Sequence, residues 1–264
     1  MNESLIITEI KDHIAWVTFN RPQKGNAMTP DFFRNLTQIF NDFNVNPDVR
    51  VVIIKAAGKH FTTGLDLIEA ADLFGNVAKD KEKFRALIVE LQESMNAVEQ
   101  CKKPVIAAAH GYCIGAGVDL LSACDIRIAM TNTIFSIRET RLAIIADLGT
   151  LQRMPYIIGH GIFKELALTG RDFNAEEALQ IGFITHVCND QNALNDKALF
   201  LAESIASCSP STVQGIKEVI LFSRDNGVYP GLTYVSQKNA AVLPSADLME
   251  AMSAFMEKRK PIFK

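Results

Sequence analysis

The chain has 264 residues, of which 48% are hydrophobic and 22% are charged. This length and composition predict a well-packed globule and exclude an intrinsically disordered chain. Because the formal charge is only −3, we expect neither a nucleic-acid partner nor a strongly cationic face for a membrane.

The cysteines and the apolar stretches disfavour further classes of protein. The five cysteines are odd in number and form no pair of C-x-x-C elements, which disfavours a disulfide framework and a zinc site. We expect reduced thiols in the core and no bound metal. The longest apolar stretches are shorter than the roughly 20 residues of a membrane helix, and no signal or transit peptide is recognised. We therefore expect no membrane partner and a cytoplasmic location.

The first elements along the chain are a hairpin and a helix. Residues 5–9 and 13–19 are rich in β-branched and aromatic side chains and flank a short polar turn, which predicts a β-hairpin. A loop follows. Thr29 and Pro30 then offer an N-cap and a proline at the first helical position, so they predict the start of a helix.

The middle of the chain alternates strands and helices. Residues 51–56 and 104–109 are apolar runs typical of strands buried on both faces, and an amphipathic helix is predicted between them over residues 81–100. This order predicts parallel pairing of the two strands. Residues 124–130 and 133–137 indicate two further short strands.

Almost all of the sequence beyond Gly149 has helical periodicity interrupted by glycine and proline. We therefore divide the chain into an α/β core over residues 1–190 and a helical region over residues 191–264. The apolar faces of the helical region need a cover, such as a neighbouring subunit.

Two segments that contain glycine follow predicted strands, residues 61–67 and 111–119. The second runs from a strand into the start of a helix, and its small residues at 115–117 let a ligand approach the backbone. Unpaired amides of a first helical turn, at the positive end of the helix dipole, suit a developing oxyanion. An ordinary turn is the alternative for each segment taken alone.

Three carboxylates lie near apolar runs, where an ionised group is expensive to bury: Asp119, Glu139 and Asp147. One reaction that could use such carboxylates is the removal of a proton from C2 of a conjugated acyl thioester. It needs a base at C2, backbone amides that stabilise the charge on the thioester oxygen, and an acid that returns a proton at the far end of the conjugated system. Glu139 and Asp147 are candidates for base and acid. The alternatives are that Asp147 caps a helix opening near Thr150 and that Asp119 offsets the dipole of its own helix.

These segments together resemble the crotonase (enoyl-CoA hydratase/isomerase) superfamily. The loop over residues 20–28 is similar to the loop that wraps the nucleotide of coenzyme A, and residues 61–67 and 113–119 are similar to the two oxyanion-hole elements. The resemblance implies a crotonase-like α/β spiral of ββα units with a helical C-terminal trimerisation region. It also implies an acyl-CoA substrate, no cofactor apart from the coenzyme A of that substrate, and a homotrimer or dimer of trimers.

The resemblance also assigns residues. Leu65 and Ala116 would donate the oxyanion-hole amides. The implied substrate-binding residues of the oxyanion hole and CoA loop are Thr63, Gly64, Leu65, Asp66, Leu67 and Ala116.

The carboxylates resemble those of the dienoyl-CoA isomerase branch of the family. Hydratases usually carry glutamate at the positions of both Asp119 and Glu139, and glycine at that of Asp147. The resemblance implies isomerisation of 3,5-dienoyl-CoA to 2,4-dienoyl-CoA in fatty acid β-oxidation. Glu139 would take the C2 proton, Asp147 would protonate C6, and Asp119 would support the pair. A hydratase that adds water to 2-enoyl-CoA is the alternative.

Two other classes compete. Gly111, Gly115 and Gly117, with Tyr234 and Lys238 spaced as Y-x-x-x-K, are similar to motifs of short-chain dehydrogenases. A dinucleotide loop belongs after the first strand, however, and here several predicted strands precede it. A non-catalytic, RNA-binding relative is disfavoured by the acidic balance.

Overall fold

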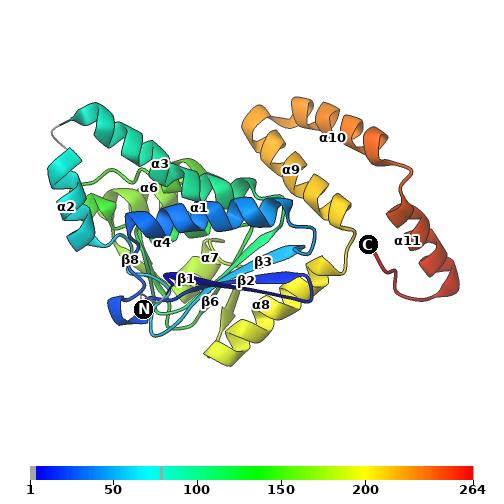
Figure 1. Cartoon of the computed structure of the whole chain (residues 1–264), viewed down its shortest axis with the longest axis horizontal. Helices are drawn as coiled ribbons and strands as arrows, with labels where there is room; N and C mark the ends of the chain where they lie inside the picture. The colour runs from blue at the N-terminus through cyan, green and yellow to red at the C-terminus, as the bar shows by residue number, and fades with distance from the viewer. Residues whose placement is uncertain (1–3, 78–79, 264) are drawn as a thin grey trace.

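The computed structural model describes residues 4–77 and 80–263 and shows a mixed α/β fold (Figure 1). The main sheet consists of β1 (Ile6–Lys11), β2 (Ile14–Phe19), β3 (Val51–Ala56), β4 (Val105–Ala109), β6 (Ile126–Met130) and β9 (His186–Cys188), adjacent in that order. Only β1 and β2 pair antiparallel in this sheet; the other neighbours are parallel. A second sheet consists of β5 (Tyr112–Ile114), β7 (Ile134–Ser136) and β8 (Asp172–Asn174).

In the described part of the chain up to β9, one or two helices follow each strand or each pair of successive strands. The described helices are α1 (Pro30–Val45), α2 (Leu67–Val77), α3 (Lys81–Gln100), α4 (Ala116–Ala123), α5 (Thr150–Arg153), α6 (His160–Thr169), α7 (Ala175–Gln180), α8 (Gln191–Ala206), α9 (Pro210–Asn226), α10 (Val228–Val242) and α11 (Ala246–Glu257). Short 3-10 helices are η1 (Pro22–Lys24), η2 (Glu139–Leu142) and η3 (Met154–Tyr156). None of the described helices is long and apolar enough to cross a membrane.

The hairpin and the first helix are confirmed. Asp12 and His13 form the two-residue turn between β1 and β2, and both have positive φ, 50° and 65°, as a type I′ turn requires. The Thr29 side chain accepts a hydrogen bond from the Phe32 amide at 3.2 Å, and Pro30 is the first residue of α1. Both elements therefore begin where local chemistry predicts.

The apolar run of β3 is explained by helices on both faces of the sheet. Val52 and Ile54 pack in one cluster with side chains of α1 and α3. Val51 and Ile53 point the other way, into a cluster with the inner side chains of α8. The core is thus two apolar layers separated by the sheet, with α1 and α3 above it and α8 below it in Figure 1.

The part of the chain beyond Gly149 differs from the expectation in two ways. The prediction that nearly all of it is helical is wrong for β8 and β9, three-residue strands too short to show a period. The first helix beyond residue 190, α8, covers one face of the sheet, whereas α9, α10 and α11 extend away from it (Figure 1). The division at residue 190 stays a prediction.

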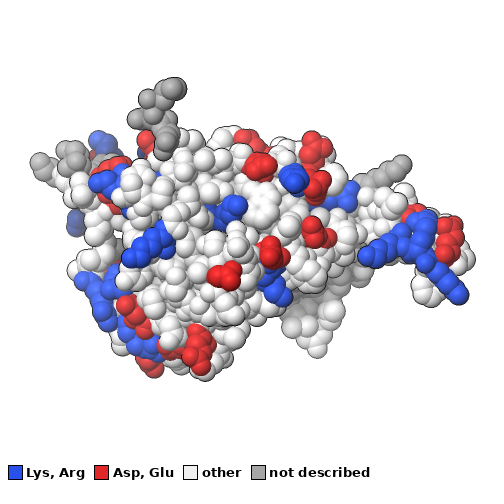
Figure 2. Space-filling model, turned by 90° about the horizontal axis from the view of Figure 1, so that it is seen from below, with Lys and Arg blue, Asp and Glu red and all other residues white. Residues whose placement is uncertain are grey.

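Neither the cysteines nor the surface charges indicate a particular function. All five cysteines are free and four are buried, but Cys208 is exposed, so the expectation of core thiols is wrong for that residue. On the face shown in Figure 2, acidic and basic side chains are interspersed. This side of the molecule therefore has no large surface of one sign.

Candidate active site

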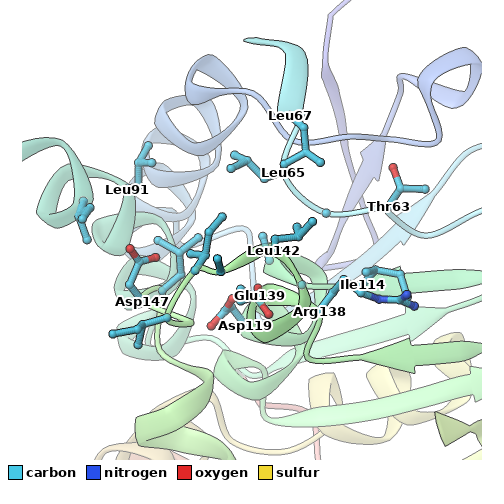
Figure 3. A pocket seen from close by; sticks show the side chains of 18 of the residues that line it. Thr63, Leu65, Leu67, Leu91, Ile114, Asp119, Arg138, Glu139, Leu142 and Asp147 are labelled. Atoms are coloured by element: carbon cyan, nitrogen blue, oxygen red, sulfur yellow. The ribbon is translucent and has the colours of Figure 1, made fainter. Parts of the chain in front are cut away.

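A cavity of about 1360 Å³ lies between α3, the segment after β3, the start of α4 and the segment that follows β7 (Figure 3). Its walls are mainly apolar, with carboxylates at a few positions. The residues that line it include Thr63, Gly64, Leu65, Leu67, Phe84, Leu87, Ile88, Leu91, Ile114, Ala116, Asp119, Arg138, Glu139, Leu142, Ile144, Asp147 and Leu148. An apolar cavity with a few convergent polar groups is the usual form of a small-molecule site.

Two backbone amides face this cavity from separate segments. The Met28 amide donates to the Gly64 carbonyl and the Asp66 amide to the Met28 carbonyl, both at 2.8 Å, which leaves the Leu65 amide outside the pairing. Ala116 is the first residue of α4, where an amide has no intrahelical partner. Within the described chain, neither amide donates a hydrogen bond to another residue.

Gly64 allows the two segments to approach each other. Its φ is +89°, and a Cβ atom there would lie 2.8 Å from the Ile114 carbonyl oxygen and 3.8 Å from the Ala116 nitrogen. A side chain at this position would be strained and would push the segments apart. The geometry leaves two free N–H groups close together, which is what stabilisation of an oxyanion requires.

Glu139 lies beside these amides, on a segment pinned from behind. The Thr140 hydroxyl donates to the Ala167 carbonyl at 2.6 Å, and Arg141 Nε donates to the Thr169 carbonyl at 3.2 Å, so η2 is held at the end of α6. A Cβ atom on Gly115 would lie 3.0 Å from Glu139 Oε1. Glu139 Oε2 is buried and has no hydrogen-bond partner in the described chain.

The pKa of Glu139 is raised to about 7, first by burial and then by the charge of Asp119. A carboxyl group with a pKa near neutrality can both accept and donate a proton at working pH. Its unpartnered oxygen is therefore available to a substrate.

Asp119 is buried at the first turn of α4, with 1% of its surface exposed. Its Oδ1 accepts a hydrogen bond from the Thr150 amide at 2.7 Å. Burial raises its pKa to about 6, although the contacts with Thr150 oppose the shift. Asp119 thus binds the first residue of α5. The alternative that Asp147 caps that helix is wrong: the N-cap is Gly149, which has no side chain to bond.

Asp147 occupies a different part of the same cavity. In Figure 3 Glu139 and Asp119 lie together, whereas Asp147 lies near Leu91 of α3. Its backbone carbonyl accepts a hydrogen bond from Gln92 Nε2 at 2.7 Å. Its carboxylate accepts none from another described residue, and burial raises its pKa while its own amide opposes the shift.

All but one of the site residues predicted from the sequence line this cavity. Asp66 is not among the residues that line the cavity. Its carboxylate pairs with Arg21 at 2.6 Å and accepts the Ile68 amide at 3.1 Å, so it joins the loop before η1 to the start of α2.

Sequence reasoning missed two groups. The apolar side chains of α3 that line the cavity are Phe84, Leu87, Ile88 and Leu91. Their spacing predicts the apolar face of a helix, but the sequence does not show that this face lines a cavity. Arg138, which also lines the cavity and pairs with Asp172 at 2.5 Å, had no local signal.

The dehydrogenase motif has a structural explanation. Tyr234 and Lys238 both bind Glu218, which joins α10 to α9. Neither residue lines the cavity. Among the described residues there is no group of three or more histidine, cysteine or acidic side chains that could hold a metal ion.

Comparison with known proteins identifies relatives of this chain. A family model described as enoyl-CoA hydratase/isomerase matches residues 9–264. The peroxisomal Delta(3,5)-Delta(2,4)-dienoyl-CoA isomerase of Arabidopsis thaliana is 46% identical over 250 residues, which are 92% of this chain and 90% of the relative. The mitochondrial Delta(3,5)-Delta(2,4)-dienoyl-CoA isomerase of Homo sapiens is 42% identical over 264 residues, 98% of this chain and 80% of the relative.

The fold also matches solved structures. The crystal structure of an enoyl-CoA hydratase from Bacillus anthracis superposes with a TM-score of 0.92 at 35% identity, and the match covers 99% of each chain. The chain belongs to the enoyl-CoA hydratase/isomerase, or crotonase, family.

Proposed function

We propose that this chain isomerises 3,5-dienoyl-CoA thioesters to 2,4-dienoyl-CoA thioesters in fatty acid β-oxidation. One observation carries the proposal. Glu139 and Asp147 line a single apolar cavity at separate positions, and Glu139 lies beside the segment that carries the free amide of Ala116. The similarity to proteins named dienoyl-CoA isomerases supports the same reaction.

The reaction needs a base, an oxyanion site and an acid. Glu139 removes a proton from C2, and the negative charge that develops on the thioester oxygen is stabilised by the amides of Leu65 and Ala116. The charge is delocalised over the conjugated chain to C6, where Asp147 donates its proton. The double bonds shift from positions 3 and 5 to positions 2 and 4, and the net proton count is unchanged.

The carboxylate pair must carry one proton for this reaction. Glu139 has to be ionised and Asp147 neutral at the start, and the roles are exchanged at the end. Burial raises the pKa of both groups, and the charge of Asp147 further raises that of Glu139, so double ionisation of the pair is disfavoured. Transfer of the proton back to Asp147 resets the site.

Asp119 is the feature that keeps hydration of a 2-enoyl-CoA as a second candidate, since a hydratase holds its water between two carboxylates. The negative charge of Asp119 acts on Glu139, and the matching structure from Bacillus anthracis is named an enoyl-CoA hydratase. However, Asp119 Oδ1 is taken by the Thr150 amide. This arrangement favours a supporting role for Asp119 over activation of water.

A paired substrate assay tests the choice. With 3,5-dienoyl-CoA we expect a gain of 2,4-dienoyl absorbance, and with 2-enoyl-CoA we expect little loss of the enoyl absorbance. Rapid hydration of 2-enoyl-CoA without any dienoyl turnover would replace the isomerase by the hydratase.

The remaining expectations concern assembly and location. The helices α9 and α11 expose large apolar side chains such as Ile220, Met252 and Phe255, which supports a homotrimer or dimer of trimers. Light scattering after size-exclusion chromatography measures the mass of the assembly and so tests the oligomeric state. No cofactor beyond the coenzyme A of the substrate is proposed. A cytoplasmic location stays a prediction, to be checked by cell fractionation, because relatives are named peroxisomal and mitochondrial.

A further inference from the structure

The segment that carries Asp147 is held by α3. Gln92 Nε2 donates to the Asp147 carbonyl at 2.7 Å. The next carbonyl, that of Leu148, accepts from Arg153 Nη1 at 3.3 Å, and Arg153 in turn donates to Asn96 Oδ1 at 2.7 Å. Two successive carbonyls are thus tied to α3, one directly and one through Arg153.

Arg153 is itself fixed in place. Its side chain is 10% exposed and forms an ion pair with Glu99 at 3.1 Å. Gly149 provides the space for the guanidinium, because a Cβ atom there would lie 1.8 Å from Arg153 Nη1. We name Gln92, Asn96 and Glu99, with Arg153, the α3 clamp.

The segment that carries Glu139 is held elsewhere. Thr140 and Arg141 bind carbonyls at the end of α6, and neither contacts the α3 clamp. The two carboxylates therefore have separate supports. We therefore expect that a disturbance of one support displaces one carboxylate more than the other.

We propose that the α3 clamp is a positioning device for proton delivery to the far end of the diene, and that Gln92 is its central positioning residue. This inference depends on the proposed isomerase function. Gln92 acts through the backbone carbonyl of Asp147, because the Asp147 carboxylate accepts no hydrogen bond from another described residue. Loss of this hydrogen bond displaces the acid from C6 and does not disturb the base at C2.

The decisive measurement compares two rates in deuterium oxide: isomerisation, followed by absorbance, and exchange of the C2 hydrogens, followed by mass spectrometry. Gln92→Met keeps the bulk of the side chain and removes its donor. We expect isomerisation to fall roughly 10- to 100-fold, since a displacement of about 1 Å can cost that much. We expect C2 exchange to stay within about threefold of the parent, so that the ratio of exchange to isomerisation rises at least about threefold.

Two variants serve as controls. Gln100→Met makes the same substitution at an exposed position of α3 and should change neither rate. Thr140→Val removes a contact that holds Glu139 and should lower both rates together, because C2 deprotonation comes first.

Circular dichroism would reveal misfolding of Gln92→Met. In that case two variants of Asn96 test the same proposal. Asn96→Ala removes the acceptor for Arg153 and should raise the exchange-to-isomerisation ratio, whereas Asn96→Asp keeps an acceptor and should restore it. If folded Gln92→Met lowers both rates equally, or neither, the clamp has no positioning role even though the isomerase function stands. If the parent protein does not convert 3,5-dienoyl-CoA at all, the proposed function fails first.

Discussion

The Asp119 carboxylate and the Thr150 amide meet at 2.7 Å across 31 residues of sequence. This hydrogen bond fixes the end of the segment that contains Asp147 against the first turn of α4. It also keeps a negative charge near Glu139, where that charge raises the pKa of Glu139 after the larger effect of burial.

Asp119→Asn should therefore shift the pH dependence of C2 exchange. Asparagine can still accept the Thr150 amide, so the fold should persist, but it carries no charge and the pKa of Glu139 should fall. C2 exchange needs ionised Glu139, so its midpoint, near pH 7 in the parent, should move to lower pH. An unchanged midpoint, measured by exchange at a series of pH values, would show that Asp119 does not act on Glu139 electrostatically.

Asp147→Asn should separate the two proton transfers. Without the acid, isomerisation should fall by roughly 10²- to 10⁴-fold, the range typical of a lost general acid, while C2 exchange stays detectable. Glu139→Gln should abolish both activities because the first step is lost. Full isomerase turnover by Asp147→Asn would rule out the assigned acid.

The pH profile of isomerisation should be bell-shaped. The active form has one proton on the pair, so kcat/KM should fall at low pH, where both groups are protonated, and at pH values above about 7, where the second proton is lost. The two apparent pKa values belong to the pair and not to either residue. A profile that keeps rising above pH 9 would contradict the requirement for a shared proton.

Glu139→Gln should stabilise the fold at alkaline pH. The ordinary pKa of 4.5 is raised to about 7 in the folded chain, so between these values the folded state holds a proton that the unfolded state has lost. The free energy of unfolding of the parent therefore decreases as pH rises through this window. At about 1.4 kcal/mol per pKa unit, the gain from glutamine should reach about 1 to 3 kcal/mol above pH 7.

Thermal unfolding at pH 5 and pH 8 measures this effect. The same substitution at Glu203, which is exposed on α8, is the control and should show no comparable pH dependence. If Glu139→Gln were no more stabilising at pH 8 than at pH 5, burial of an ionised Glu139 would carry no cost.

Gly64→Ala should damage the oxyanion site. The new Cβ would lie 2.8 Å from the Ile114 carbonyl oxygen on a backbone with φ +89°, so the segment with the Leu65 amide must move away from Ala116. We expect kcat to fall by roughly 10²- to 10³-fold, the usual effect of losing one oxyanion donor. Gly161→Ala is the control, because a Cβ there meets no atom within 4 Å and activity should be retained.

Parts of the site could be predicted from the sequence because their causes are local. The small residues at 115–117 indicate a helix start open to a ligand, and residues 61–67 are a glycine-containing segment that follows a predicted strand. The apolar run before Asp147 indicates a carboxyl group with a raised pKa. Each signal depends on a few adjacent residues, so no tertiary information is needed to read it.

Other parts depend on contacts between distant segments. No local pattern shows that Asp119 binds the Thr150 amide, that Gln92 holds the Asp147 carbonyl, or that Asp66 turns to Arg21 instead of the cavity. Side chains such as these choose partners only after the helices have packed. Nor can three-residue strands such as β8 and β9 be recognised, because they are shorter than the period that would reveal them.

By itself, the sequence determined the α/β class, the first hairpin and helix, and the residue types available for chemistry, because caps, turns and hydrophobic periodicity act over a few positions. The tertiary structure decided which carboxylate accepts the amide of the first residue of α5 and which remain free in the cavity. That choice depends on the distances between α3, α4 and the segment after β7, which side-chain packing sets across the whole chain.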